Sequence, residues 1–118
     1  MKKPAPANMY RWQLRAHEAL GRMVAHGVKH DFPPLMWTLA STGALTGEAI
    51  GLASTPDEQR AALEQWATYL KATVKERTDR DGVVHLYAPF KWGKGEWDAG
   101  ALRATIYPPL EDEDGESS

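Results

Sequence analysis

The sequence predicts an α+β fold, a two-layer sandwich with the element order α-β-β-α-β-β. Two segments, residues 9–26 and 56–77, carry apolar residues at helical spacing. Two pairs of shorter segments have the alternation, or the β-branched and aromatic residues, that are typical of strands. Two such helices can cover one face of a four-stranded antiparallel sheet, and the other face then stays at least partly exposed to solvent.

The first helix is expected from Met9 to about His26. Asn8 can cap its N-terminus, and Gly27 stands where helices often end in a left-handed residue. The apolar positions that recur at helical spacing are Tyr10, Leu14, Leu20, Met23 and Val24. The pattern therefore predicts an amphipathic helix that ends at Gly27.

Residues 35–52 are expected to form a β-hairpin. Pro33 and Pro34 stop a preceding helix, and the segment that follows them is rich in aromatic and β-branched residues. Thr42 and Gly43 signal a turn, after which a second strand with two glycines follows.

The start of the second helix is the clearest local signal in the chain. Thr55 can cap this helix, Pro56 suits its first position, and Glu58 completes a capping box. The helix is expected to continue to about Arg77. Its apolar stripe consists of Leu63, Trp66, Ala67, Leu70 and Val74.

Two alternating segments, residues 83–88 and 101–107, follow the polar turn at 78–82 and predict the last two strands. One face of these strands carries the apolar residues Val84, Leu86, Leu102, Ala104 and Ile106. The opposite face carries His85, Tyr87, Arg103, Thr105 and Tyr107.

Composition divides the chain into three parts. Residues 1–7, with two prolines and two lysines, predict a flexible lead, and residues 8–110 predict a single α+β domain. Residues 111–118 predict a disordered tail, because they hold five of the 16 acidic residues. Residues 1–110 have 14 basic and 11 acidic side chains, and a net charge of +3.

Several classes of function are disfavoured by the composition. The chain has no cysteine, which excludes disulfides, thiolate catalysis and cysteine-bound zinc. No stretch approaches the ~18 apolar residues of a membrane span, and prolines interrupt any signal peptide, so we expect a cytoplasmic protein without membrane contact. No phosphate-binding glycine loop and no nucleophile elbow occurs, so we predict no catalytic and no cofactor-binding residues.

Two histidines are the strongest candidates for metal ligands. His26 and His30 have the i, i+4 spacing that places both on one helical face. Because Gly27 is expected to end the helix between them, we interpret them as exposed histidines near the helix end and predict no metal site. Glu48 is likewise interpreted as an exposed carboxylate on a strand.

Two neighbouring regions suggest an interaction surface. His85, Tyr87, Arg103 and Tyr107 mix aromatic planes with a basic group on the second sheet face, as stacking platforms for single strands do. The surface is expected to continue into the loop at residues 89–98.

The loop combines aromatic and basic residues. It contains Lys91, Trp92, Lys94 and Trp97, with two glycines between the tryptophans. We predict that Trp92 is exposed near its tip and that Trp97 packs against the domain. The alternative is that Phe90 and Trp97 fold back to cover the sheet and close the core of a small domain.

Four segments carry a resemblance to known sequences: residues 33–39, residues 43–48, the 58–70 segment with its central Trp66, and the strand at 84–88. In these segments, within residues 33–107, the chain resembles small uncharacterised actinobacterial proteins that are often associated with phages and integrative elements. The resemblance implies a phage or mobile-element setting and implies no activity.

Three functional hypotheses follow. The first is a small non-enzymatic protein that binds a protein partner through the second sheet face and the 89–98 loop. The second is an accessory factor that binds single-stranded nucleic acid at the same surface. The third is an enzyme of unknown reaction, for which no convergent set of polar residues is visible in the sequence.

Overall fold

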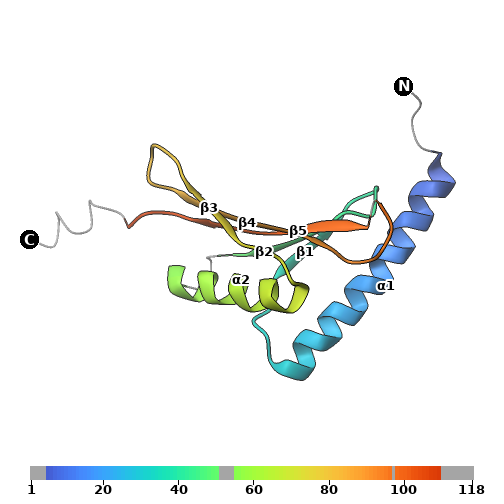
Figure 1. The fold of residues 1–118 in the computed structure, drawn as a ribbon, viewed down its shortest axis with the longest axis horizontal. Coiled ribbons are helices and arrows are strands. Elements are labelled where there is room, and N and C mark those ends of the chain that lie inside the picture. Colours follow the sequence, from blue (N-terminus) through green and yellow to red (C-terminus); the bar gives the residue numbers. More distant parts are fainter. Residues whose placement is uncertain (1–4, 51–54, 97, 110–118) are drawn as a thin grey trace, which may run out of the picture.

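The computed structural model describes residues 5–50, 55–96 and 98–109 and shows an α+β fold (Figure 1). The expected acidic tail at 111–118 lies outside these residues. The described elements are α1 (Pro6–His30), β1 (Met36–Leu39), β2 (Leu45–Ala49), α2 (Pro56–Leu70), β3 (Lys75–Thr78), β4 (Val84–Lys91) and β5 (Ala99–Ile106).

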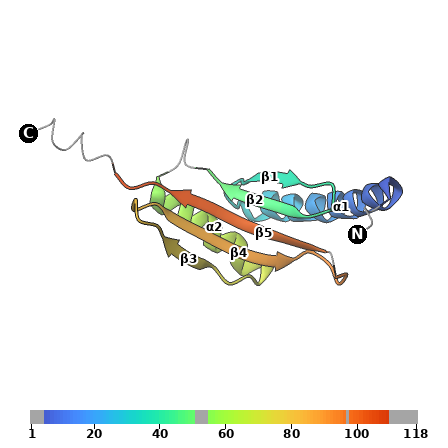
Figure 2. The ribbon, with the colours of Figure 1, turned by 90° about the horizontal axis from the view of Figure 1, so that it is seen from above.

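The described strands form one mixed sheet with the order β1-β2-β5-β4-β3 (Figure 2). β1 and β2 form the predicted antiparallel hairpin, and β4 is antiparallel to both β3 and β5. The expectation of four antiparallel strands is wrong, because the sheet has a fifth strand and β2 pairs with β5 in parallel. Parallel neighbours need a long crossover, and here α2 and the β3–β4 hairpin lie between them in the chain.

The additional strand comes from a segment that was expected to be helical. α2 begins at the predicted capping box, in which Thr55 and Glu58 each bond the other's backbone N–H. It ends at Leu70 and not near Arg77, because Lys71 adopts a left-handed conformation with φ of 57° and caps the helix. Strand pairing with β4 then outweighs the helical propensity of the polar residues in β3.

Helix α1 is longer than expected at both ends. Pro6 occupies its first turn, and the helix continues through Gly27 to His30. Asp31 provides the left-handed cap, with φ of 58°. The glycine serves packing instead of termination, because a Cβ at this position would lie 3.0 Å from the ring of Trp66.

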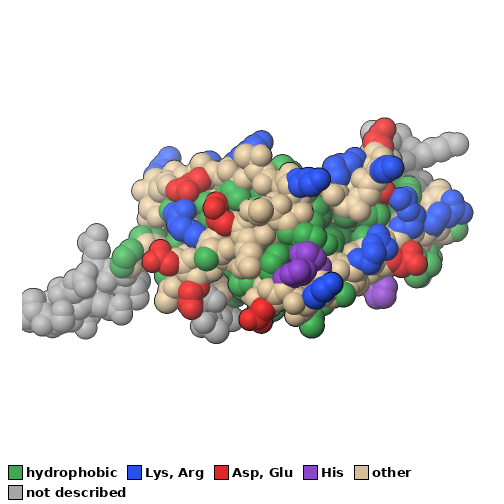
Figure 3. Space-filling model, turned by 60° about the horizontal axis from the view of Figure 1, so that its bottom comes forward, with side chains coloured by type: hydrophobic (Ala, Val, Ile, Leu, Met, Phe, Trp, Pro, Cys, Tyr) green, Lys and Arg blue, Asp and Glu red, His purple; other side chains and the backbone are tan. Residues whose placement is uncertain are grey.

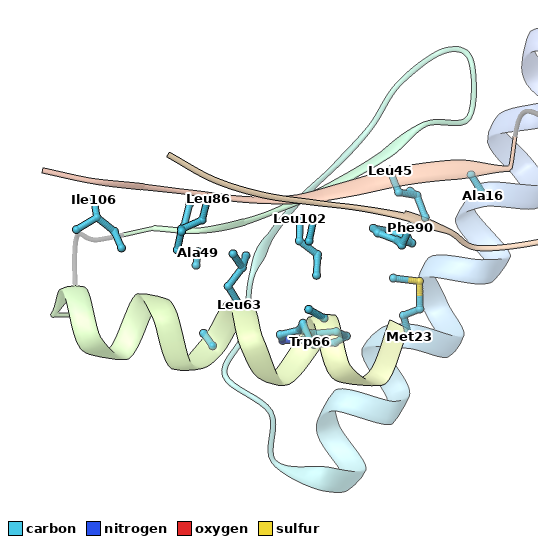
Figure 4. Packing of buried hydrophobic residues seen from close by; sticks show 14 residues of the cluster. Ala16, Met23, Leu45, Ala49, Leu63, Trp66, Leu86, Phe90, Leu102 and Ile106 are labelled. Atoms are coloured by element: carbon cyan, nitrogen blue, oxygen red, sulfur yellow. The ribbon is translucent and has the colours of Figure 1, made fainter. Parts of the chain in front are cut away.

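The hydrophobic core lies between the sheet and α2 (Figure 4). α2 runs beneath the sheet, while α1 crosses the end of the sheet and extends beyond it (Figure 1). Leu45, Leu63 and Leu102 are the largest fully buried side chains and join β2, α2 and β5. The predicted apolar face of the last two strands is confirmed, since Leu86, Leu102, Ala104 and Ile106 are all buried there.

Trp66 connects the two helices. It is 2% exposed and makes edge contacts with the rings of Phe32 and Trp37, at centroid distances of 5.0 and 5.5 Å. Its indole Nε1 donates a hydrogen bond of 2.7 Å to the carbonyl oxygen of Pro33. The segment between α1 and β1 is therefore held against α2 by one side chain.

Replacing Trp66 by Ala is expected to lower the free energy of unfolding by about 3–5 kcal/mol, because it removes this contact and leaves a cavity. Chemical denaturation followed by circular dichroism measures the change. Tyr10→Ala is the control, since Tyr10 is 69% exposed and its loss should change stability by less than about 0.5 kcal/mol. Equal stability of the two variants would contradict the packing role of Trp66.

Candidate binding surface

Strands β4 and β5 separate the core from an open face of the sheet. Leu86, Ala88 and Phe90 of β4 are buried toward the helices, so the alternate residues of this strand point the other way. The predicted face with His85, Tyr87 and other polar residues is thus open and has no helix over it in the described structure (Figure 2).

One row of side chains crosses this open face from β3 to β2. Lys75 lies opposite Tyr87, Tyr87 lies opposite Arg103, and Arg103 lies opposite Glu48. Neighbouring strands are about 4.8 Å apart, so Tyr87 stands between two cationic positions. Because Tyr87 is 46% exposed, its ring is accessible to a ligand.

A second row lies beside the first. Arg77 is opposite His85, and His85 is opposite Thr105. His85 Nε2 lies 3.0 Å from Asp79 Oδ2, while the other oxygen of Asp79 accepts hydrogen bonds from the backbone N–H groups of Asp81 and Val83. The bond to His85 lowers the pKa of Asp79 below its ordinary value, and the backbone donors act in the same direction. The β3–β4 turn therefore holds His85 in place.

These two rows surround a shallow hollow of about 380 Å³. We call its five basic and aromatic residues the cationic sheet face: they are Lys75, Arg77, His85, Tyr87 and Arg103. Sequence reasoning missed Lys75 and Arg77, because it placed them in the second helix. The polar turn at 78–82 was the available signal, since it could have been interpreted as joining two paired strands.

Not every predicted surface residue joins the cationic sheet face. Tyr107 is 70% exposed and lies beyond the end of β5. Lys91 is the last residue of β4, and its Nζ donates a hydrogen bond of 2.7 Å to the carbonyl oxygen of Gly95. Lys94 is exposed in the loop between β4 and β5, and none of the three lines the hollow.

The prediction that Trp92 is exposed at a loop tip is wrong. Its ring is partly buried and packs against the core, and Nε1 donates hydrogen bonds of 3.2 and 3.1 Å to the carbonyl oxygens of Gly43 and Ala99. The guanidinium of Arg15 lies 5.5 Å from the ring centroid. Of the two residues in the alternative, Phe90 is buried in the core as expected, whereas Trp97 lies outside the described residues.

Asp98 explains the glycines of this loop. Its carboxylate is buried, forms an ion pair of 2.6 Å with Arg15, and accepts a hydrogen bond of 2.9 Å from the backbone N–H of Gly95. A Cβ at Gly93 or Gly95 would collide with this carboxylate. The loop is consequently shaped around a buried anion and does not project as a free recognition element.

The two histidines of α1 do share a helical face, because the helix continues past Gly27. His26 stacks on Tyr69 with a centroid distance of 3.7 Å, and its ring lies 4.3 Å from that of His30. Burial lowers the pKa of His26, and the charges of His30 and Lys29 add to this effect. Among residues 5–50, 55–96 and 98–109, no cluster of three His, Asp or Glu side chains is suited to a metal ion.

No helix in the described part of the chain is long and apolar enough to cross a membrane. Comparison of the chain with models of protein families, with curated proteins and with solved structures gives no match. The geometry of the surface is therefore the basis for a functional proposal.

Replacing Trp92 by Ala is expected to lower the free energy of unfolding by about 3 kcal/mol, because core contacts and two indole hydrogen bonds are lost. Thermal and chemical denaturation measure this effect. Lys94→Ala in the same loop is the control and should remain within about 0.5 kcal/mol of the parent. A Trp92 variant as stable as the control would mean that the loop is not anchored as described.

Proposed function

We propose that this chain is a small non-enzymatic binding protein that holds single-stranded nucleic acid on its cationic sheet face. The observation that carries the proposal is the cross-strand row in which Tyr87 stands between Lys75 and Arg103. An accessible aromatic ring can stack on a base of any identity, and flanking cations can contact the adjoining phosphates. An open sheet suits single strands, whose bases are free to lie flat on it.

The balance of charge on the face supports this ligand. Lys75, Arg77 and Arg103 are exposed there, and Glu48 lies at the far end of the first row. Glu76 points to a different partner, because its carboxylate forms an ion pair of 2.9 Å with Arg60 on α2. The hydrogen bond with Arg60 lowers the pKa of Glu76 and keeps this carboxylate charged. The hollow is thus bordered mainly by cations.

A protein partner was our first expectation for this face, and two observations favour nucleic acid instead. The loop that should have extended the patch is anchored through Trp92 and Asp98. Protein interfaces also need a desolvated centre with large apolar or aromatic anchors, and the hollow offers only Tyr87 in this role. Most of the charged residues in the remaining lining are basic, which suits phosphates better.

The setting that we propose is that of a cytoplasmic accessory factor of a phage or integrative element, as the sequence resemblance implies. We propose no chemical reaction and no cofactor for this surface.

Replacing Tyr87 by Ala is expected to weaken binding of a fluorescein-labelled single strand of about 12 nucleotides. Loss of one stacked base costs about 1–3 kcal/mol, which raises the Kd about 5- to 150-fold. Fluorescence anisotropy with oligothymidylate and oligouridylate measures the Kd of each variant. Tyr10→Ala, which removes an equally large ring from α1, should leave the Kd unchanged.

The same assay at several salt concentrations tests the cationic residues. Arg103→Ala should reduce the slope of log K against log salt by about 0.7, which corresponds to one phosphate contact on a single strand. Absence of binding by the parent protein at low salt would overturn the proposed function.

Deletion of residues 111–118 is expected to tighten binding of the same oligonucleotide severalfold at low salt, because five acidic residues no longer compete for the cations. The difference should fade as salt is raised. A full-length variant with Gln and Asn in place of these acids is the matched control and should behave like the deletion. Weaker binding after either change would show that the tail assists the ligand.

A further inference from the structure

Helix α1 displays an apolar stripe that no other described segment covers and that the proposed function does not use. Tyr10, Leu14, Val24 and Val28 are 69%, 66%, 43% and 79% exposed. These four residues belong to one series with alternating steps of four and three residues, which His17 and Gly21 complete. This is the spacing of a seam along which a second helix packs. We call these six positions the α1 stripe.

The position of the α1 stripe on the helix is defined by its neighbours. The residues just before Leu14, Gly21, Val24 and Val28 face the interior or are partly covered: they are Gln13, Leu20, Met23 and Gly27. The residues just after the stripe positions form a solvent-exposed edge that is mainly basic. In order along the helix they are Arg11, Arg15, Glu18, Arg22, Ala25 and Lys29.

This basic edge is visible as a gathering of Lys and Arg side chains over the α1 end of the helix-bearing side (Figure 3). Arg15 is engaged by Asp98. Arg11, Arg22 and Lys29 form no ion pair with any residue of the described part of the chain. Three cations therefore border the α1 stripe without an ion-pair contact among the described residues.

Two hollows lie at the ends of the α1 stripe. The first, of about 280 Å³, is formed by Pro6, Met9, Tyr10, Gln13 and Ser41. The second, of about 390 Å³, lies between the end of α1 and the segment leading to β1; its lining includes Val24, Val28, Phe32, Leu35 and Trp37. Tyr10 and Val24 are about 21 Å apart along the helix axis. Each hollow can receive one large apolar side chain of the same partner helix.

The middle of the α1 stripe permits a close approach. A Cβ at Gly21 would meet no atom within 4 Å, so the absence of a side chain there relieves no internal contact. Glycine inside a helix costs about 1 kcal/mol relative to alanine. A partner backbone that crosses at this point would make use of the space.

We propose that the α1 stripe is the docking site for an amphipathic helix of another protein, with apolar residues at heptad spacing and an acidic edge. The apolar residues cover the stripe and fill the two hollows, and the carboxylates pair with Arg11, Arg22 and Lys29. Charge complementarity therefore specifies the partner's edge, and the spacing of the hollows specifies its length.

Two other occupants fit the α1 stripe less well. A second copy of this chain brings the same basic edge, in which Glu18 is the only carboxylate. The acidic segment 111–118 has the right charge, but it has no large apolar residue, and Leu110 just before it cannot by itself fill two hollows about 21 Å apart. A lipid surface requires a broad continuous apolar face, and here His17 and Gly21 interrupt it.

Three labelled helical peptides of about 21 residues test the proposal by fluorescence anisotropy. They share leucine at heptad positions and carry Glu, Gln or Lys along one edge. The Glu peptide should bind at least about ten-fold more tightly than the Gln peptide, and the Lys peptide most weakly. Equal binding of the three peptides, or binding of none, would overturn the proposal.

Variants of the exposed positions locate the peptide. The double substitution Leu14→Gln and Val28→Gln should weaken binding of the Glu peptide at least about ten-fold. Gly21→Leu should also weaken binding of this peptide while α1 stays folded. The charge reversals Arg22→Glu and Lys29→Glu should transfer the preference to the Lys peptide. Two substitutions away from α1, Tyr107→Gln and Tyr87→Ala, should leave binding of the Glu peptide unchanged. Circular dichroism confirms folding of each variant.

Sedimentation and vesicle binding distinguish the remaining occupants. If the parent chain is a dimer and Leu14→Gln makes it monomeric, the α1 stripe binds a second copy of the chain. This result would overturn the proposal. Binding to vesicles of phosphatidylcholine and phosphatidylglycerol that the same substitution abolishes would assign it to lipid, with the same consequence. The nucleic-acid assay is independent of the sedimentation and vesicle experiments, because the cationic sheet face that it tests lies on the open face of the sheet and not on α1.

Discussion

The packing of Trp66 is the contact on which the rest of the structure depends. A short α2 presents this ring to the underside of the sheet, and the chain leaving α1 wraps around it through Phe32, Pro33 and Trp37. Gly27 lets α1 approach the ring closely. One aromatic side chain thus links α2 to the end of α1, while α2 covers the sheet and α1 extends past its end (Figure 1).

A second constraint acts where the loop between β4 and β5 meets α1. The buried carboxylate of Asp98 gathers Arg15 and Gly95, and Trp92 covers the same junction with hydrogen bonds to the β1–β2 turn at Gly43 and to Ala99 of β5. Burying a carboxylate away from water is costly unless it is paired with a cation. The loop that carries Asp98 therefore packs against α1, which supplies Arg15. This requirement makes the 89–98 region part of the framework instead of a contact surface.

Within the described part of the chain, these two constraints leave two surfaces without internal partners, and the surfaces differ in chemistry. The open side of the sheet offers one aromatic ring among cations, which suits a ligand of flat bases and phosphates. The outer side of α1 offers an apolar seam with a basic border and room for side chains at each end. Because the two surfaces belong to different elements, the two ligands that we propose need not exclude each other.

Local signals in the sequence were sufficient for the elements whose stability is local. The capping box at Thr55 determines where α2 begins, and the two-residue alternation of β4 and β5 determines which face is buried, so Tyr87 and Arg103 were correctly placed on the open face. The end of α2, the identity of β3 and the parallel pairing of β2 with β5 were decided only in the tertiary structure. The residues around Lys75 show no apolar alternation that marks a strand. They form β3 because the edge of β4 offers unpaired backbone groups beside them. Trp92 stands between a lysine and a glycine, so the sequence likewise predicted that it is exposed. Its partly buried position depends on residues far apart in the chain, because Arg15 of α1 pairs with the buried Asp98 and also lies over the Trp92 ring.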